Sequence, residues 1–220
     1  MSNTLKLLIF DMDGLMIDTE RLSEKSWKAA AKEHGYDIPQ SVFNRIIGRD
    51  NRRIPEIFTE VLGEDYPYDL IYQEKCVRSA AYVKEHGVPV KEGLKECLDF
   101  AAAQQLKMAV ASSTRHDRVC SYLEQIGILD CFQLIQSGED IPRGKPNPDV
   151  FLLVCEKMGV DPGQAVVLED STNGLLAAKA AGIRSIWIPD LCVVPDEVIK
   201  TVWKQGKTLA DVPGMLQEII

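Results

Sequence analysis

The sequence predicts an α/β protein with a doubly wound parallel sheet and an all-helical insertion after the first strand. Short apolar runs that are typical of buried strands alternate with stretches of helical periodicity over most of the chain. Strands that alternate with helices form parallel sheets, and the helices cover both faces. Residues 19–85 break this alternation, because they contain helical stretches and no good strand.

Five runs rich in β-branched or aromatic residues are the predicted strands. The first is an uninterrupted apolar stretch, which is typical of a strand buried on both faces of a parallel sheet. Turn residues such as glycine bound these runs. The predicted strands are Leu5–Phe10, Met108–Ala111, Phe132–Ile135, Ala165–Leu168 and Ser185–Ile188.

Most segments between these strands are predicted to be helices. Their apolar residues recur at spacings of three and four, which places them on one face of a helix. This pattern covers residues 94–102, 119–126, 150–158 and 174–181, and Gly182 closes the last of them. The tail, residues 201–220, is expected to fold back as a closing segment that contains a helix.

The chain is divided by this pattern into a core, residues 1–17 and 87–220, and an inserted helical domain, residues 18–86. Glycine and proline residues separate the helical stretches of the insertion. An insertion at the end of the first strand can act as a lid over a site there. Its predicted helices are Glu20–His34, Ser41–Ile47, Ile54–Leu62 and Leu70–Lys84.

Composition excludes several classes of protein. The 220 residues carry a formal net charge of −8 with no basic run, which argues against a nucleic-acid or anionic-membrane surface. The six scattered cysteines form no Cys-x-x-Cys pair, which favours free thiols over a disulfide framework or a zinc site. No window reaches the roughly 18 apolar residues of a membrane helix. We therefore expect a cytoplasmic protein, and a monomer because no interface signature is visible.

Two carboxylates, Asp11 and Asp13, follow the first predicted strand directly. The carboxyl ends of the strands are where open α/β sheets bind ligands. Residues two apart in an extended segment point the same way, so both acids are expected to face one site. Paired carboxylates repel each other unless a cation or a proton holds them together. The pair favours a Mg²⁺ site, a nucleophile with an acid/base partner, or both; two solvated acids before a turn are the alternative.

Polar residues of matching chemistry lie near other predicted strand ends. Ser112, Ser113 and Thr114 follow the second strand and can hold phosphate oxygens at a helix N-terminus. Lys145, between glycine and proline, can pair with a carboxylate and a phosphoryl oxygen. Glu169 and Asp170 offer a second pair of oxygen ligands for Mg²⁺. Each of these residues by itself could have an ordinary structural role. Because they all lie at the carboxyl ends of predicted neighbouring strands, they are expected to converge on one crevice.

These motifs resemble the four ordered motifs of the haloacid dehalogenase superfamily, most closely its phosphatase and β-phosphoglucomutase-like branch. The similarity spans residues 5–190. It implies a Rossmann-like core, a helical cap inserted after the first strand, and Mg²⁺ as the cofactor. The motifs are Asp11-Met12-Asp13-Gly14, Ser112, Lys145 in Gly-Lys-Pro-Asn-Pro-Asp, and Glu169-Asp170-Ser171 with Gly174.

The resemblance also implies a role for each motif residue. Asp11 would attack phosphorus and form an aspartyl phosphate. Asp13 would protonate the leaving oxygen and then activate water, while its backbone carbonyl helps to bind Mg²⁺. Ser112 and Lys145 would hold the transferring phosphoryl group. Asp170 would bind the metal directly and Glu169 directly or through water, so the implied metal ligands are Asp11, Asp13, Glu169 and Asp170.

Asp13 favours hydrolysis of a phosphate monoester among the activities of this superfamily. Its dehalogenases and its phosphonate-hydrolysing branch do not use an acid/base aspartate at that place. We therefore expect a phosphatase that acts on a small phosphorylated metabolite. A β-phosphoglucomutase-type mutase is the alternative, weakened because Ser23 stands where those mutases carry a histidine. A phospho-receiver module is a second alternative, although receivers are about half this length and lack the helical insertion.

Substrate specificity is expected to come from the helical insertion. Arg49, Arg52 and Arg53 form its one local cluster of positive charge. They fall where caps of this family often face the active site, so they are candidates to bind the distal part of the substrate, with Arg52 favoured. A solvated helix start is the alternative.

Overall fold

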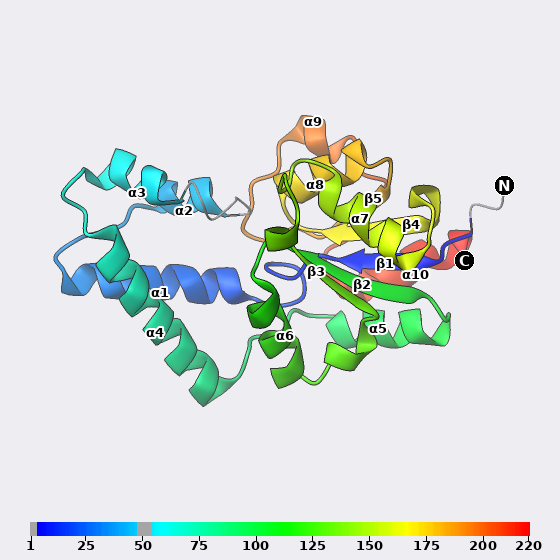
Figure 1. The fold of residues 1–220 in the computed structure, drawn as a ribbon, viewed down its shortest axis with the longest axis horizontal. Coiled ribbons are helices and arrows are strands. Elements are labelled where there is room, and N and C mark those ends of the chain that lie inside the picture. Colours follow the sequence, from blue (N-terminus) through cyan, green and yellow to red (C-terminus); the bar gives the residue numbers. More distant parts are fainter. Residues whose placement is uncertain (1–3, 48–53) are drawn as a thin grey trace.

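The computed structural model, which describes residues 4–47 and 54–220, has a parallel sheet at its centre (Figure 1). The strand order is β3-β2-β1-β4-β5-β6, and each pair of neighbours is parallel. The chain runs outward from β1 to β3 and then returns to β4 on the other side of β1, so the order of the strands reverses beside β1. This reversal leaves a crevice at the carboxyl ends of β1 and β4. The strands are β1 (Leu7–Phe10), β2 (Lys107–Ser112), β3 (Leu134–Ser137), β4 (Ala165–Glu169), β5 (Arg184–Trp187) and β6 (Lys204–Gln205).

Alternate residues of β1 pack against helices on opposite faces of the sheet. Leu8 and Phe10 belong to the apolar cluster that includes α5, α6 and α10. Leu7 and Ile9 belong to the cluster that includes α7 and α8. All four side chains are fully buried, which explains why this strand is apolar without interruption. The core helices are α5 (Leu94–Ala103), α6 (His116–Gln125), α7 (Asp149–Met158), α8 (Thr172–Ala180), α9 (Asp196–Ile199) and α10 (Val212–Leu216).

Short 3₁₀ turns complete the core. They connect strands and helices or continue the last helix to the end of the chain. Among the described residues they are η2 (Leu129–Cys131), η3 (Gly138–Asp140), η4 (Pro162–Gln164), η5 (Leu209–Asp211) and η6 (Gln217–Ile219).

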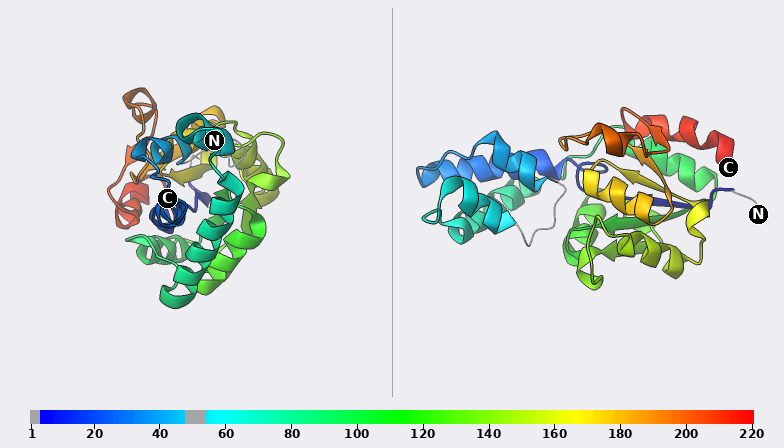
Figure 2. Two further views of the ribbon diagram at one scale, coloured as in Figure 1. Left: turned by 90° about the vertical axis from the view of Figure 1, so that its left-hand side faces the viewer. Right: turned by 90° about the horizontal axis from the view of Figure 1, so that it is seen from above.

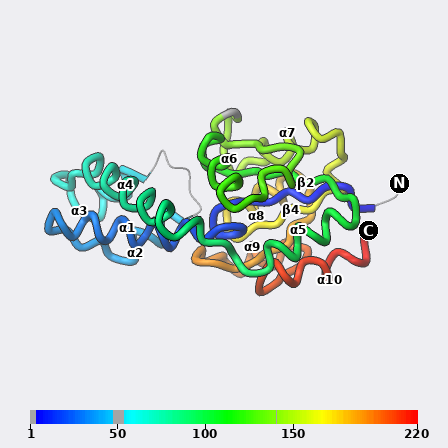
Figure 3. Tube along the Cα trace, turned by 90° about the horizontal axis from the view of Figure 1, so that it is seen from below, coloured from blue at the N-terminus to red at the C-terminus, as the bar shows by residue number. Residues whose placement is uncertain are grey.

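Among the described residues, four helices form a separate body, called the cap below, beyond the carboxyl ends of the strands (Figures 1 and 2). The cap has an apolar core of its own, in which the ring of Trp27 lies 4.4 Å from that of Phe58. The C-terminus lies at the opposite end of the molecule (Figure 3). The cap helices are α1 (Thr19–Glu33), α2 (Gln40–Ile46), α3 (Ile54–Leu62) and α4 (Tyr68–His86).

The two chain segments that join the cap to the core run side by side. The backbone N–H of Asp18 donates to the carbonyl of Pro89 at 2.8 Å, and that of Lys91 donates to Met16 at 2.9 Å. Because both crossings are bonded to each other, the cap enters and leaves the core at one place, next to the end of β1.

The predicted fold class is confirmed, with one strand missing from the prediction. The structure has a sixth strand, β6, where the sequence indicated only a closing segment; its two residues are polar and too few to show periodicity. The expected helix of this tail is present as α10. In the described part of the chain, none of the helices combines the length and the apolarity that crossing a membrane requires.

Candidate active site

Asp11 lies at the end of β1, in the crevice beside β4. Its backbone N–H donates to the carbonyl of Leu168 at 3.1 Å, which continues the strand pairing up to this residue. The chain then turns at Gly14, where φ is +85°. A Cβ on Gly14 would lie 2.4 Å from Asp170 Oδ2. Only glycine therefore allows this turn to pack against Asp170.

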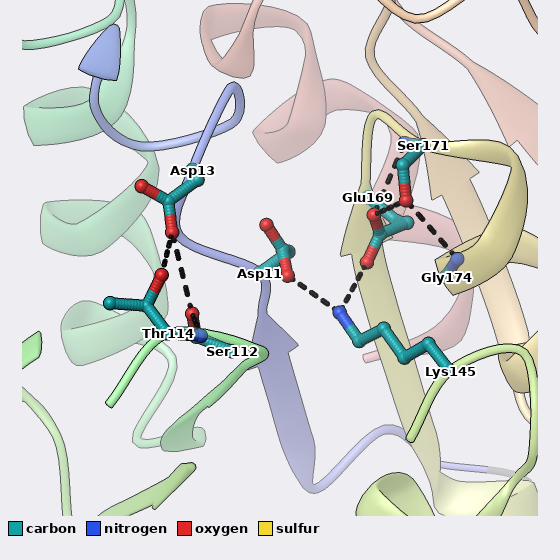
Figure 4. Close-up of polar contacts among 8 residues, drawn as sticks. All are labelled: Asp11, Asp13, Ser112, Thr114, Lys145, Glu169, Ser171 and Gly174. Atoms are coloured by element: carbon teal, nitrogen blue, oxygen red, sulfur yellow. Dashed lines mark hydrogen bonds and ion pairs between the residues drawn. The ribbon is translucent and has the colours of Figure 1, made fainter. Parts of the chain in front are cut away.

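Lys145 joins two of the predicted acids in a buried ion-pair network (Figure 4). Its Nζ lies 2.5 Å from Asp11 Oδ1 and 2.8 Å from Glu169 Oε2. The side chain of Lys145 is only 6% exposed, so these pairs are shielded from solvent. The lysine enters from the loop before α7, and Phe151 of that helix lies under its ammonium group at 5.0 Å.

Glu169 is fixed from its other side by the first turn of α8. The hydroxyl of Ser171 donates to Glu169 Oε1 at 2.6 Å, and the backbone N–H of Ser171 donates to the same oxygen at 3.1 Å. Ser171 also caps the helix, because its Oγ accepts from the N–H of Gly174 at 3.1 Å. A Cβ on Gly174 would lie 2.0 Å from Glu169 Cδ, so a side chain there would displace the carboxylate.

Asp170 supplies the feature that best fits a metal ion. It is 1% exposed, and its Oδ1 has no hydrogen-bond partner among the described residues. Carboxylate oxygens of Asp11, Glu169 and Asp170 lie within 4.8 Å of one another. A buried carboxylate oxygen without a partner is costly, and a cluster of carboxylates is the ligand set that hard cations such as Mg²⁺ prefer. The residues present therefore fit Mg²⁺.

The charges of this cluster are unbalanced without a cation. Burial, and next the charge of Glu169, raise the pKa of Asp11 to about 7. Burial also raises the pKa of Asp170, with Glu169 and Asp11 adding to it. Burial by itself would lower the pKa of Lys145, but Asp11 and Glu169 outweigh it and raise that pKa. The single ammonium group of Lys145 thus lies in a cluster with three carboxylates. A divalent cation would supply the positive charge that this cluster lacks.

Asp13 is bonded to groups on both the core and the cap. Its Oδ2 accepts from the hydroxyl of Thr114 at 2.7 Å and from that of Ser112 at 3.5 Å. Its Oδ1 accepts from the hydroxyl of Thr19, the first residue of α1. Figure 4 shows the Asp13 carboxylate on the Thr114 side of the site, apart from Asp11, Lys145 and Glu169. The sequence interpretation named Thr114 as a hydroxyl for phosphate oxygens, whereas its hydroxyl binds Asp13 here. It did not identify Thr19, a short hydroxyl residue next to a predicted motif.

A cleft of about 200 Å³ lies between the cap and the strand ends. Glu169 does not line it, since its side chain is 1% exposed behind Lys145. Arg49, Arg52 and Arg53, the predicted specificity residues, lie outside the described residues. The predicted site residues that line the cleft are Asp11, Asp13, Ser112, Ser113, Lys145 and Asp170.

The cap contributes polar residues to this cleft, two of which, Lys75 and Ser79, the sequence interpretation missed. Lys75 and Ser79 of α4 line it, as does Ser23 of α1. Lys75 and Ser79 lie four residues apart and so share one face of the helix. In the sequence they look like ordinary members of a surface helix, because nothing local shows which face of α4 lies over the cleft.

Comparisons with known proteins agree with this geometry. A family model described as haloacid dehalogenase-like hydrolase matches residues 8–188. The phosphorylated carbohydrates phosphatase of Thermotoga maritima is 31% identical over 188 residues, which are 83% of this chain and 84% of that protein. Hexitol phosphatase B of Escherichia coli (strain K12) is 32% identical over 194 residues, 82% of each chain. The crystal structure of CbbY from Rhodobacter sphaeroides in complex with phosphate shares the fold, with a TM-score of 0.79, 24% identity and coverage of 94% of this chain and 96% of that one.

Proposed function

The chain belongs to the haloacid dehalogenase-like hydrolases and is a hydrolase of phosphate esters, and we propose that it cleaves a small phosphate monoester with Mg²⁺ through an aspartyl phosphate on Asp11. The observation that carries this proposal is the buried network in which Lys145 binds both Asp11 and Glu169. Beside it lies the Asp170 oxygen that has no partner among the described residues. Together they provide a nucleophile, a cation to hold a phosphoryl oxygen, and ligands for a metal.

The first step transfers the phosphoryl group to the protein. A carboxylate oxygen of Asp11 attacks phosphorus, and the bond from phosphorus to the ester oxygen breaks. Asp13 gives its proton to that oxygen, so the alcohol leaves neutral. Asp13 is held by Thr19 and Thr114 in the structure, and we expect its carboxyl group to turn toward Asp11 when substrate binds.

The second step releases phosphate. Asp13, now ionised, takes a proton from water, the water oxygen attacks phosphorus, and the bond between phosphorus and Asp11 breaks. Inorganic phosphate leaves, and Asp13 is protonated again for the next turnover. Throughout both steps Ser112, Ser113 and Lys145 hold the phosphoryl oxygens by hydrogen bonds.

Four residues would bind the cation that this charge distribution requires. When bound, Mg²⁺ would neutralise charge on the phosphoryl group and so favour attack by an anionic nucleophile. The Asp170 side chain is the strongest candidate for a direct ligand, since its Oδ1 is buried without a partner among the described residues. The others would be Asp11, the backbone carbonyl of Asp13, and Glu169 directly or through water.

The relatives indicate the substrate class and the reaction. Two of them are named for phosphatase action on phosphorylated carbohydrates and on hexitol phosphates, so we infer a sugar- or polyol-sized phosphate ester here. Ser23 lines the cleft and offers a hydroxyl where a mutase of this branch carries a histidine, which supports hydrolysis over transfer to a second sugar hydroxyl. Family membership supports an enzyme over a phospho-receiver.

Phosphate release from a panel of sugar and polyol phosphates tests the proposal. We expect release that needs Mg²⁺, is abolished by EDTA, and is lost in Asp11→Asn. Asp99→Asn is the matched control, because Asp99 is an exposed acid on α5 that pairs only with Lys95 among the described residues. Including β-glucose 1-phosphate with its bisphosphate activator separates the mutase, which would form glucose 6-phosphate without free phosphate. Full activity of Asp11→Asn would rule out the aspartyl phosphate.

A further inference from the structure

Lys75 is a buried cation for which the described residues provide no ion-pair partner. It lies on α4, is 7% exposed and lines the cleft. Lys145, another lysine that lines the cleft, has two carboxylates within 4.0 Å. Lys75 has none among the described residues. Lysine is rarely buried without a partner because removing its charge from water is costly. The charge of Asp13 favours the ammonium form from a distance, but no carboxylate of the described residues contacts the ammonium group, which leaves this contact to a ligand.

Ser79 adds a second unsatisfied group beside Lys75. It lies one helical turn further along α4, is 3% exposed, and its hydroxyl has no hydrogen-bond partner among the described residues. Tyr72, also on α4, lines the cleft as well, and the centre of its ring lies 5.9 Å from the ammonium group of Lys75. A buried ammonium and a buried hydroxyl thus face the same cleft from one helix face. Together they offer donors and an oxygen to a ligand.

The electrostatic surroundings favour an anionic ligand over a neutral one. Burial lowers the pKa of Lys75, and the nearby charge of Arg118 on α6 lowers it further, whereas Cys76 and Asp13 act in the opposite direction. Arg118 lines the same cleft from the core side, and its Nε donates to the hydroxyl of Tyr122 at 2.9 Å, which leaves guanidinium donors for a ligand. The charge of Asp13 acts on both Lys75 and Arg118. One carboxylate does not balance two cations, so an anionic ligand is favoured over a neutral hydroxyl, which can only accept a hydrogen bond from Lys75.

We propose that Lys75 and Ser79 form a subsite for a second anionic group, so that the preferred substrate is a sugar- or polyol-sized phosphate ester that also carries a carboxylate or another phosphate. This inference rests on the proposed function in one respect, that the ester phosphate lies at Asp11. The second anion then lies at the cap wall of the same cleft, across from Arg118. Specificity would come from described residues of α4, whether or not the predicted arginines contribute.

Matched pairs of esters test the subsite in the unmodified protein. One pair is 6-phosphogluconate against glucitol 6-phosphate, which differ in a carboxylate. The other is fructose 1,6-bisphosphate against fructose 1-phosphate and fructose 6-phosphate, which differ in a phosphate. With Mg²⁺ present, we expect kcat/KM to be about 10- to 100-fold higher for the anionic member of at least one pair, the range for a charged hydrogen-bonded contact. The pair that shows the preference identifies the anion.

Variants then assign the preference to α4. Lys75→Met should reduce the ratio within the preferred pair to about 3-fold or less, and Ser79→Ala should lower it by about 2- to 5-fold. Lys84→Met, an exposed lysine near the end of the same helix, is the matched control and should keep the wild-type ratio. A thermal melt of each variant shows whether it is folded.

The outcomes separate this inference from the proposed function. Equal kcat/KM for both members of both pairs would refute the subsite and leave the phosphatase proposal intact. An unchanged ratio in folded Lys75→Met would also refute the subsite. Should no ester, including p-nitrophenyl phosphate, release phosphate with Mg²⁺, the proposed function itself would be wrong. If Lys75→Met does not fold, the wild-type ratios still test for the second-anion preference, and Ser79→Ala then tests whether α4 provides it.

Discussion

Replacing Lys145 by methionine is the most informative single perturbation of this site. The change removes one ammonium group and keeps a side chain of similar length over the Phe151 ring. It leaves two buried carboxylates, Asp11 and Glu169, that had been 2.5 and 2.8 Å from that ammonium group. A protein that uses Lys145 to hold these acids must respond in both stability and activity.

The structure sets how much stability and activity the Lys145→Met variant is expected to lose. Removing one partner of a buried ion pair costs about 3–5 kcal/mol. For a chain of this length, that corresponds to a fall in Tm of about 6–20 °C. The same 3–5 kcal/mol, lost from the transition state, would lower kcat/KM by about 10²- to 10⁴-fold.

The loss of stability should depend on pH in a defined direction. The pKa of Asp11 in the folded protein is raised to about 7 from 3.8, so its ionised form destabilises the fold at high pH and the acid takes up a proton as the pH falls through 7. Without Lys145 that pKa rises further, and protonation relieves the unpaired charge. The difference in Tm between Lys145→Met and wild type should therefore be larger at pH 9 than at pH 6.

Thermal unfolding in EDTA at both pH values measures this difference. EDTA removes divalent cations, so the comparison concerns the protein charges alone. Lys179→Met, an exposed lysine in the last turn of α8, is the matched control and should unfold within about 1–2 °C of wild type. A Tm for Lys145→Met within that same interval at pH 9 would refute the view that Lys145 holds the buried carboxylates.

Three further predictions address the proton donor, the packing around Glu169 and the metal. Asp13→Asn should nearly abolish phosphate release from alkyl esters and affect p-nitrophenyl phosphate far less, because a phenolate leaves without a proton; equal losses for both esters would contradict the acid role. Gly174→Ala should lower Tm and kcat, since its Cβ would lie 2.0 Å from Glu169 Cδ, whereas Gly163→Ala, with open space around it, should do neither. Mg²⁺ at 100 times its Kd should raise the Tm of wild type by about 5–10 °C, and Asp170→Asn should remove most of that shift in calorimetry; an unchanged shift would place the cation elsewhere.

The sequence alone determined the sheet, its winding and the position of the chemistry. The unbroken apolar run of β1 indicates that the strand is buried on both faces, as the structure shows. The spacing of apolar residues along the chain reflects which positions are buried, so it predicts such elements from the sequence. Because parallel strands end at one edge of a sheet, the sequence by itself assigns Asp11, Lys145 and Asp170 to one crevice, which all three line. Strand β6 was missed, because two polar residues carry no periodic signal.

Only the tertiary structure decided how the cap meets this crevice. That Thr19 bonds to Asp13, and that Lys75 and Ser79 line the cleft, depends on which face of α1 and α4 packs over the strand ends. A lone lysine in a helix has the same local pattern whether it is solvated or buried. The unpartnered oxygen of Asp170 is likewise a property of its surroundings, since the number of hydrogen bonds that a carboxylate receives is set by neighbours distant in the chain.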